Sequence, residues 1–174
     1  MMSLELYQRG LLELIKGRGV VAEDPYLCSV AASREIEILR EIAVWWRVFQ
    51  IEAQCHFTAR LLKRLGCLHE TVALYFATNR TSPFVEELSR DFLKWLRFHD
   101  NPLVRTVAEF EWALLEVRGD SSETFQVLWD RHPDLFFKSL ESGEEFPETE
   151  TDCLYRMTLA RELPGLVACT REEL

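Results

Sequence analysis

The spacing of apolar side chains changes once along this chain, about two thirds of the way through, and this change limits the folds open to it. Before that point, large apolar residues recur every three or four positions, as on the buried face of an α-helix. Beyond it, Phe125, Val127 and Trp129 alternate with their neighbours, as in a half-buried β-strand. The sequence therefore predicts a mostly α protein, with a helical module over 1–118 and a small α+β module over 119–174.

The longest helical pattern follows Ser33, a residue type that often caps helix N-termini, and Gly66 ends it. Apolar residues cover much of its circumference, which predicts a central helix covered by other helices. One break is expected between Trp46 and Ile51. The apolar residues form two lines along the helix, with Leu39, Ile42, Trp46, Phe49, Ala53, Phe57, Leu61 and Leu65 in the first and Ile38, Trp45, Ile51, Cys55 and Leu62 in the second.

Four shorter helices are expected around this long one, each with its own start or stop signal. The stretch Val20–Ala32, punctuated by Asp24-Pro25, is predicted to be a loop. The four helices are Ser3–Lys16, Thr71–Ala77, one with Ser82 as N-cap and Pro83 in its first turn, and one that begins at Asn101-Pro102 and ends at Gly119-Asp120.

The small module is expected to contain three short strands and one helix. Because so few elements bury little surface, the module is expected to dock on the helices rather than to fold alone. Its predicted parts are a strand at 124–129, a helix at His132–Leu140, an acidic loop at Glu141–Asp152, a strand at 155–160, a turn at Glu162–Gly165 and a strand at Leu166–Cys169.

The formal net charge is −9, and most of it lies in the small module. Residues 1–118 carry 15 basic and 16 acidic side chains, whereas residues 119–174 carry 5 and 13. An acidic surface repels phosphate groups, so nucleic acid and anionic membranes are disfavoured as partners. A basic or neutral peptide is easier to attract, although an acid-rich surface can equally serve solubility alone.

Five cysteines, at positions 28, 55, 67, 153 and 169, form no disulfide framework or metal-binding spacing. The first helix is interrupted by charges, so the pattern of a secretory signal is missing, and the expected location is the cytoplasm. No apolar run is long enough for a membrane span.

Residues able to carry chemistry are scattered, and the sequence predicts no catalytic residues and no metal ligands in this chain. His56, His69, His99 and His132 form no pair with metal-binding spacing. Glu111 lies in an apolar pattern and is either a buried acid with a shifted pKa or, as we favour, a structural glutamate. An exposed sheet edge can instead accept an extended peptide as a further strand, unless a helix or the acidic loop covers that edge.

Several segments together resemble one family of small partner proteins. They are Trp46-Arg47, the run from Phe49 to Thr58 with Leu61-Leu62, Phe110 to Ala113, Val127 to Asp130 with Pro133, Tyr155-Arg156, and Leu163-Pro164-Gly165. This pattern resembles the partners of multinuclear non-heme iron oxidative enzymes that modify cysteines in ribosomally made peptides (RiPP biosynthesis). The resemblance spans about residues 36 to 169 and consists of packing residues rather than a catalytic signature.

The resemblance implies an accessory subunit that forms a heterodimer with a separate TIM-barrel enzyme. The iron would belong to that enzyme, so no cofactor is expected in this chain. The C-terminal module would be similar to a peptide-recognition element that holds the leader of the precursor peptide by strand addition. The methanobactin and 3-thiaglutamate pathways are the two settings, and we favour the second. The implied peptide-binding residues are Phe125, Val127, Trp129, Tyr155, Met157 and Leu159.

Two other functions stay open at this point. A helical metalloenzyme would use Glu109, Glu111 or the histidines, and a DNA-binding regulator would use the small module as a winged-helix-like unit, against its negative charge. If the strand at 155–160 faces the peptide, a proline at Met157 is expected to weaken peptide binding. Exposed aromatic residues such as Trp45 or Trp112 would mark a docking face or belong to the core.

Overall fold

The computed structural model describes residues 3–17, 24–82, 84–119 and 122–173. It confirms the predicted fold class, because helices dominate and a small three-stranded antiparallel sheet lies near the C-terminus. The elements are α1 (Leu4–Ile15), α2 (Pro25–Ala31), α3 (Arg34–Gln54), α4 (His56–Arg64), α5 (Leu68–Thr78), α6 (Val85–Leu96), α7 (Pro102–Arg118), β1 (Phe125–Trp129), α8 (Pro133–Ser142), β2 (Cys153–Leu159), the 3₁₀ turn η1 (Pro164–Leu166) and β3 (Val167–Glu173).

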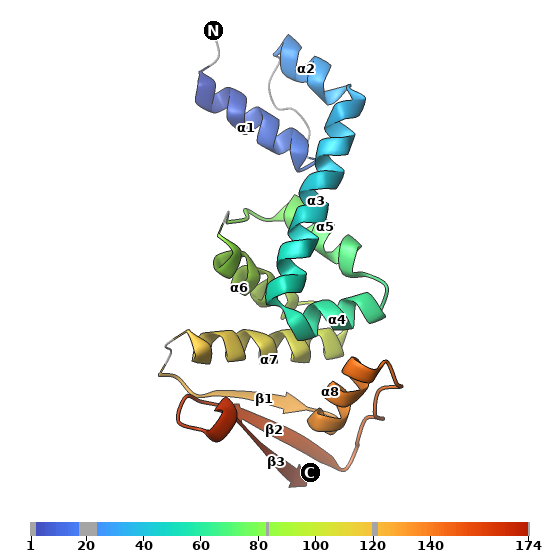
Figure 1. The fold of residues 1–174 in the computed structure, drawn as a ribbon, viewed down its shortest axis with the longest axis vertical. Helices are drawn as coiled ribbons and strands as arrows, with labels where there is room; N and C mark the ends of the chain where they lie inside the picture. The colour runs from blue at the N-terminus through green and yellow to red at the C-terminus, as the bar shows by residue number, and fades with distance from the viewer. Residues whose placement is uncertain (1–2, 18–23, 83, 120–121, 174) are drawn as a thin grey trace.

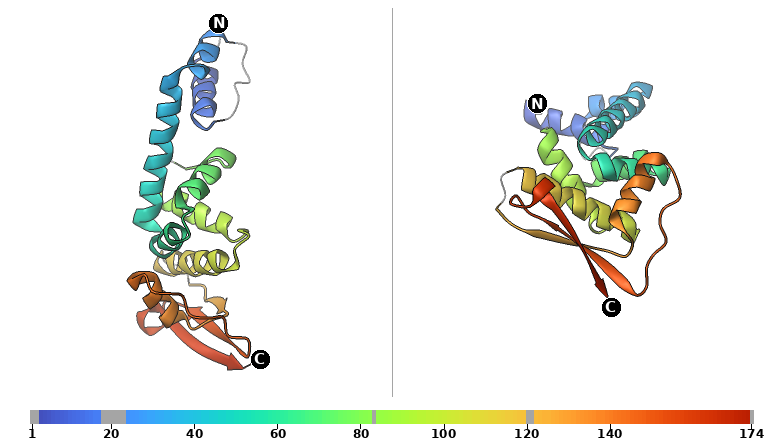
Figure 2. Two further views of the ribbon diagram at one scale, coloured as in Figure 1. Left: turned by 90° about the vertical axis from the view of Figure 1, so that its right-hand side faces the viewer. Right: turned by 60° about the horizontal axis from the view of Figure 1, so that its bottom comes forward.

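The molecule is elongated, with the first two helices at one end and the sheet at the other (Figure 1). The long helix α3 runs from the N-terminal end to the middle, where α4, α5 and α6 gather (Figure 2). Helix α7 lies between these helices and the sheet, and it contacts both α4 and β1. Helix α7 is therefore the structural link between the two predicted modules.

The N-terminal arm, which we define as α1, α2 and the first half of α3, has a small core of its own. Its buried residues are Leu14, Leu27 and Ile36. The prediction of a loop over 20–32 is wrong from Pro25 onward, because α2 forms there; residues 20–23 lie outside the described chain. Asp24 caps α2 by accepting hydrogen bonds from the backbone N–H groups of the second and third helical residues, at 3.0 and 3.1 Å.

The expected break in the long helix is present, but it falls at Cys55 rather than between residues 46 and 51. The backbone of Cys55 leaves helical geometry there, with φ −105° and ψ 66°. The prediction that other helices cover α3 on most sides is wrong as well. Only Ile36, Gln50 and Ile51 of α3 are buried, whereas several of its largest apolar side chains are exposed.

Helices α6 and α7 begin close to the expected proline signals. Asn101 caps α7 through its side-chain oxygen, and Gly119 ends that helix as predicted. In α6 the N-cap position is occupied by Phe84, not Ser82, although the Ser82 hydroxyl accepts a hydrogen bond from the Phe84 N–H at 3.1 Å. Pro83 and Asp120 lie outside the described residues.

The three strands form one antiparallel sheet in the order β1-β2-β3, so β2 is central. Val127 pairs with Met157, which in turn pairs with Cys169. The third strand runs to Glu173, four residues beyond its predicted end, and the second begins two residues earlier than predicted.

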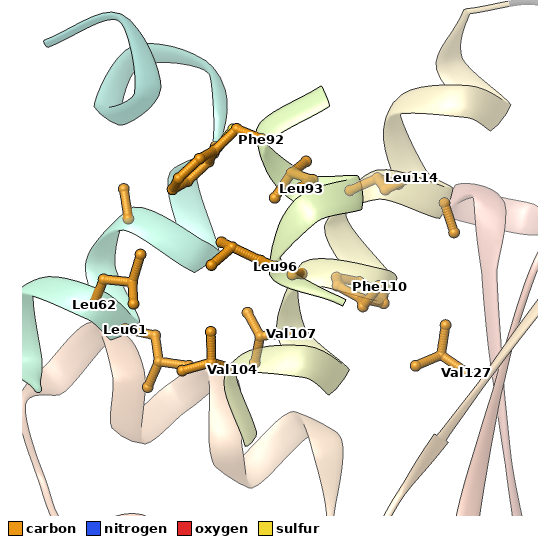
Figure 3. Close-up of a cluster of buried hydrophobic side chains, with 14 of the residues drawn as sticks. Leu61, Leu62, Phe92, Leu93, Leu96, Val104, Val107, Phe110, Leu114 and Val127 are labelled. Atoms are coloured by element: carbon orange, nitrogen blue, oxygen red, sulfur yellow. The ribbon is translucent and has the colours of Figure 1, made fainter. Parts of the chain in front are cut away.

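One continuous hydrophobic core joins the helices to the sheet. Figure 3 shows Phe110 and Leu114 of α7 between the side chains of α4 and α6 and Val127 of β1. Helix α8 adds Phe136 to this core, and Arg64 of α4 binds the end of α8 by donating a hydrogen bond to the Ser139 carbonyl oxygen at 2.7 Å. The small module therefore packs on the helices through a shared interior.

Within the described parts of the chain, no helix combines the length and the apolar character needed to cross a bilayer.

Candidate functional site

The six residues predicted to bind a peptide lie on the sheet face that turns toward α7 and α8. Five of them are at most 6% exposed, and Phe125 is half-buried. The ring of Trp129 contacts those of Phe136 and Phe137 in α8, each at 5.3 Å between centroids. Side chains buried in this way belong to the core, so they are not available for contacts with a peptide.

A proline at Met157 cannot test peptide binding as the sequence suggests, because β2 is the central strand. Its backbone is paired with β1 on one side and β3 on the other, in register over the whole strand. A proline at Met157 would break an internal ladder and unfold the sheet rather than probe a binding edge. Only β1 and β3 have an edge that no described strand covers.

Of the two edge strands, β3 has the side chains that are more exposed to solvent. Cys169 and Arg171 point to the same face as Met157 and Tyr155 of β2, yet both are exposed, whereas those two neighbours are 4% and 6% exposed. The helix layer therefore covers β2 and ends before β3. In Figure 1, β3 is accordingly the strand farthest from α7.

The hydrogen-bonding direction of β3 follows from the turn that precedes it. The Ala160 N–H donates to the Leu166 carbonyl oxygen at 3.1 Å, across the β2–β3 connection. Backbone groups in an antiparallel strand point alternately to its two sides. With the observed register, Thr170 thus faces β2, whereas the backbone N–H and C=O groups of Cys169 and Arg171 point to the free edge.

A polar network on the outer face holds β3 to the rest of the sheet. Arg156 of β2 forms a two-pronged ion pair with Glu172 of β3, at 2.6 and 2.8 Å, and also donates to Gln126 of β1 at 2.7 Å. The Arg156 hydrogen bond and positive charge lower the pKa of the Glu172 carboxyl group. One guanidinium thus connects all three strands and orders the edge strand.

A second network ties the inner face of β3 to the acidic loop. Glu150 accepts hydrogen bonds from the Cys153 thiol and the Tyr155 hydroxyl, both at 2.8 Å, and lies 3.6 Å from Arg171. These two hydrogen bonds lower the pKa of Glu150, and the bond to Glu150 raises the pKa of Tyr155 to about 12. The ring of His132 packs on Tyr155 at 5.0 Å.

The charge next to the free edge is mixed but leans acidic. Partial burial raises the pKa of the Cys169 thiol, and the negative charge of Asp134 in α8 raises it further. Arg171 provides one positive charge, while Glu173 is exposed at the end of the strand. A peptide added at this edge would meet an exposed thiol, a guanidinium and nearby carboxylates.

The three acidic residues of α7 each have a structural partner. Glu109 pairs with Arg97 at 3.0 Å, and Glu116 lies 3.4 Å from Arg90. Glu111 is buried and accepts two backbone hydrogen bonds at the start of α4. Among the described residues, no group of three or more His, Cys, Asp or Glu is placed to hold a metal ion.

The two tryptophans considered as docking residues differ. Trp112 is half-buried, with its ring edge-on to Phe125 at 5.3 Å and the guanidinium of Arg97 5.0 Å from its centre, so it serves packing. Trp45 is 62% exposed on α3. Because apolar periodicity is the same for a covered and a bare helix face, the sequence carried no signal to separate these two roles.

Comparison of the chain with protein-family models, with curated proteins and with solved structures found no match.

Proposed function

We propose that this chain is a non-catalytic partner subunit that holds a precursor peptide for a separate iron-dependent enzyme that modifies cysteines. The observation that carries the proposal is the free edge of β3, whose backbone groups at Cys169 and Arg171 point outward beside uncovered side chains. An extended peptide can pair with such an edge as a fourth strand. The resemblance described above supports the enzyme as the second partner.

The edge is suited to strand addition because it is ordered before a peptide arrives. Arg156 and Glu150 fix β3 from its two faces, so binding does not have to order the receiving strand. A preordered edge lowers the entropy cost of binding. The six residues that the sequence assigns to the peptide, five of them buried and Phe125 half-buried, support this role indirectly, because they hold the sheet on α7 and α8.

The surroundings favour a neutral or basic peptide with an apolar residue. Leu135 of α8 is 50% exposed and follows Asp134, which lies near Cys169. Residues of a strand point alternately to two faces, so every second peptide side chain would point to the face of the sheet on which α8 lies. We place the complex in the cytoplasm. All five cysteines lie in the described residues and are free thiols, as is usual in a reducing compartment.

Two binding measurements test the proposal. The purified chain is titrated with the synthetic leader of the precursor peptide encoded beside its gene, and separately with the purified iron enzyme encoded there. Saturable binding of both in titration calorimetry is the expected result. Binding of the peptide is also expected to slow alkylation of Cys169, while Cys28, exposed at the other end of the molecule, keeps its rate.

The outcomes separate the alternatives. A chain that binds neither partner would refute the proposal. Substrate turnover by the isolated chain, with metal found by elemental analysis, would instead support the helical metalloenzyme. Salt-dependent binding to duplex DNA would support the regulator.

A further inference from the structure

Six large apolar side chains of α3 form one exposed surface, which we call the aromatic stripe. They recur at intervals of three, four and seven residues, so they lie on one side of the helix. The rings of Trp45 and Trp46 both stack on Phe49, at 6.2 and 5.6 Å between centroids. The stripe consists of Ile38, Leu39, Ile42, Trp45, Trp46 and Phe49, which are 48–62% exposed.

The stripe is too large for an ordinary surface feature of a monomer. Its six side chains expose on the order of 700 Å² of apolar surface, whereas the largest patch on a typical monomer is about 300–600 Å². The value is close to the ~800 Å² that each partner contributes to a standard protein–protein interface. Tryptophan and phenylalanine are also enriched where such interfaces are most tightly packed.

The other side of α3 is already in use. It packs on α1, α4, α5 and α6 (Figure 2). Two of its arginines bind other segments there: Arg40 donates to the Leu14 carbonyl oxygen at 2.7 Å, and Arg47 donates to the Ser82 carbonyl oxygen at 3.3 Å. The stripe is therefore the face of α3 that remains for another molecule.

The charges around the stripe indicate which kind of molecule fits. Of the exposed charged residues of α3, Glu35 lies within the side that carries the stripe and Glu41 and Arg34 lie beside it, whereas Glu37 lies on another side, so acids outnumber bases around the stripe. A surface bordered by lysine and arginine complements this rim. A second copy of the chain offers no such basic border. Parallel pairing brings both sets of acids together, and antiparallel pairing about the centre of the stripe brings Glu35 to Glu52, which already pairs with Lys63 at 2.8 Å.

We propose that the aromatic stripe of α3 binds the catalytic subunit, through an apolar surface on that enzyme bordered by basic residues. This inference rests on the proposed function and locates its second interface. The stripe lies on the helical part of the elongated molecule, while the free edge of β3 lies at the opposite end (Figure 1). Peptide and enzyme thus bind two separate surfaces of one chain.

The N-terminal arm would be stabilised by the proposed interface. Its core has three buried residues, and it exposes Leu4, Leu6 and Leu12 of α1 as well as the N-terminal end of the stripe. An arm with so small a core is weakly stabilised by its own packing. A bound enzyme would cover the exposed apolar surface of the arm and thereby stabilise the arm's fold.

The test measures the affinity of the purified iron enzyme for single variants of the full-length chain. Trp45→Ala and Phe49→Ala are expected to weaken binding at least about tenfold, as truncation of central aromatic residues does. Phe98→Ala is the matched control, because Phe98 is 88% exposed but lies after α6, away from the stripe. The double change Glu35→Lys and Glu41→Lys is expected to slow association at low salt.

Each result has a defined meaning. Loss of enzyme binding in the stripe variants, with unchanged circular dichroism and unchanged peptide affinity, supports the inference. Equal enzyme binding by wild type and stripe variants overturns it and leaves the proposed function standing. Dimers of the chain alone that Trp45→Ala converts to monomers would show that a second copy covers the stripe, and would overturn it too. A wild-type chain that binds no enzyme refutes the proposed function itself.

Discussion

The carboxylate of Glu111 accepts a hydrogen bond from the backbone N–H of Thr58, with 2.8 Å between Oε2 and the nitrogen. Its other oxygen, Oε1, accepts from the Phe57 N–H at 2.9 Å. A residue of α7 thus caps the N-terminus of α4, a position that no side chain of α4 itself caps. The break between α3 and α4 is held by this contact across more than fifty positions of sequence.

Replacing Glu111 by alanine is expected to destabilise the protein by about 2–4 kcal/mol, because two backbone donors lose their acceptor in a site that is largely closed to water. Urea unfolding followed by tryptophan fluorescence measures the change. Glu109→Ala is the control on the same helix, since the Glu109–Arg97 pair is exposed and is expected to contribute less than about 1 kcal/mol. Equal losses in the two variants would contradict the capping role.

The pH dependence of stability is expected to contain a contribution from Glu111. Burial raises the pKa of this carboxyl group in the folded protein, against the opposing effect of its hydrogen bonds to Thr58 and Phe57. A raised folded pKa favours the folded state below the unfolded pKa of about 4.3. That advantage disappears as the pH rises through the folded pKa. Glu111→Gln, which cannot ionise, is expected to lose this slope in unfolding free energy measured from pH 4 upward, and an unchanged slope would refute it.

Trp129 is expected to hold the sheet on the helices. Its fully buried ring contacts Phe110, Phe136 and Phe137, so Trp129→Ala is expected to cost about 3–5 kcal/mol. Its indole N–H is buried and finds no hydrogen-bond partner among the described residues. Trp129→Phe removes that unsatisfied donor and keeps an aromatic ring, so it is expected to cost well under half as much. A larger loss for phenylalanine than for alanine, in chemical unfolding, would contradict this.

Hydrogen exchange is expected to show the direction of the β3 backbone. The amides of Cys169 and Arg171 face the free edge, so they should exchange fast in the free protein and slowly when a peptide is bound. The Thr170 amide faces β2 and should be protected in both states, which makes it an internal control. The exchange is followed residue by residue by NMR. Protection of Cys169 before any peptide is added would mean that the edge is covered.

Cap signals and apolar periodicity predicted most elements, and one miss was avoidable. Asp24-Pro25 carries the same cap-plus-proline signal as Asn101-Pro102, which was interpreted as a helix start. Helix α2 has only seven residues, so it offers little apolar periodicity that could indicate a helix. Alternation located β1 well because each side chain there faces either the core or solvent.

What the sequence alone did not reveal depends on contacts between distant residues. The α3–α4 break is fixed by Glu111, so no local signal marks Cys55. The bare face of α3 has the same pattern as a covered one, so the pattern predicts a covered helix and leaves Trp45 open as a core or a docking residue. The candidate edge was placed on the wrong side chains because alternation finds the inner face of a strand but not its order in the sheet.

Because helices and sheet share one interior, the sheet that is proposed to hold a peptide cannot be excised from the helices. Cutting the chain after α7 would strip Val127, Trp129 and Leu159 of the helical surface that shields them. A fragment of this kind would expose the apolar face of its sheet and is expected to aggregate rather than fold as an independent domain. For the proposed peptide-binding edge to work on another scaffold, α7 would have to be transferred together with the strands.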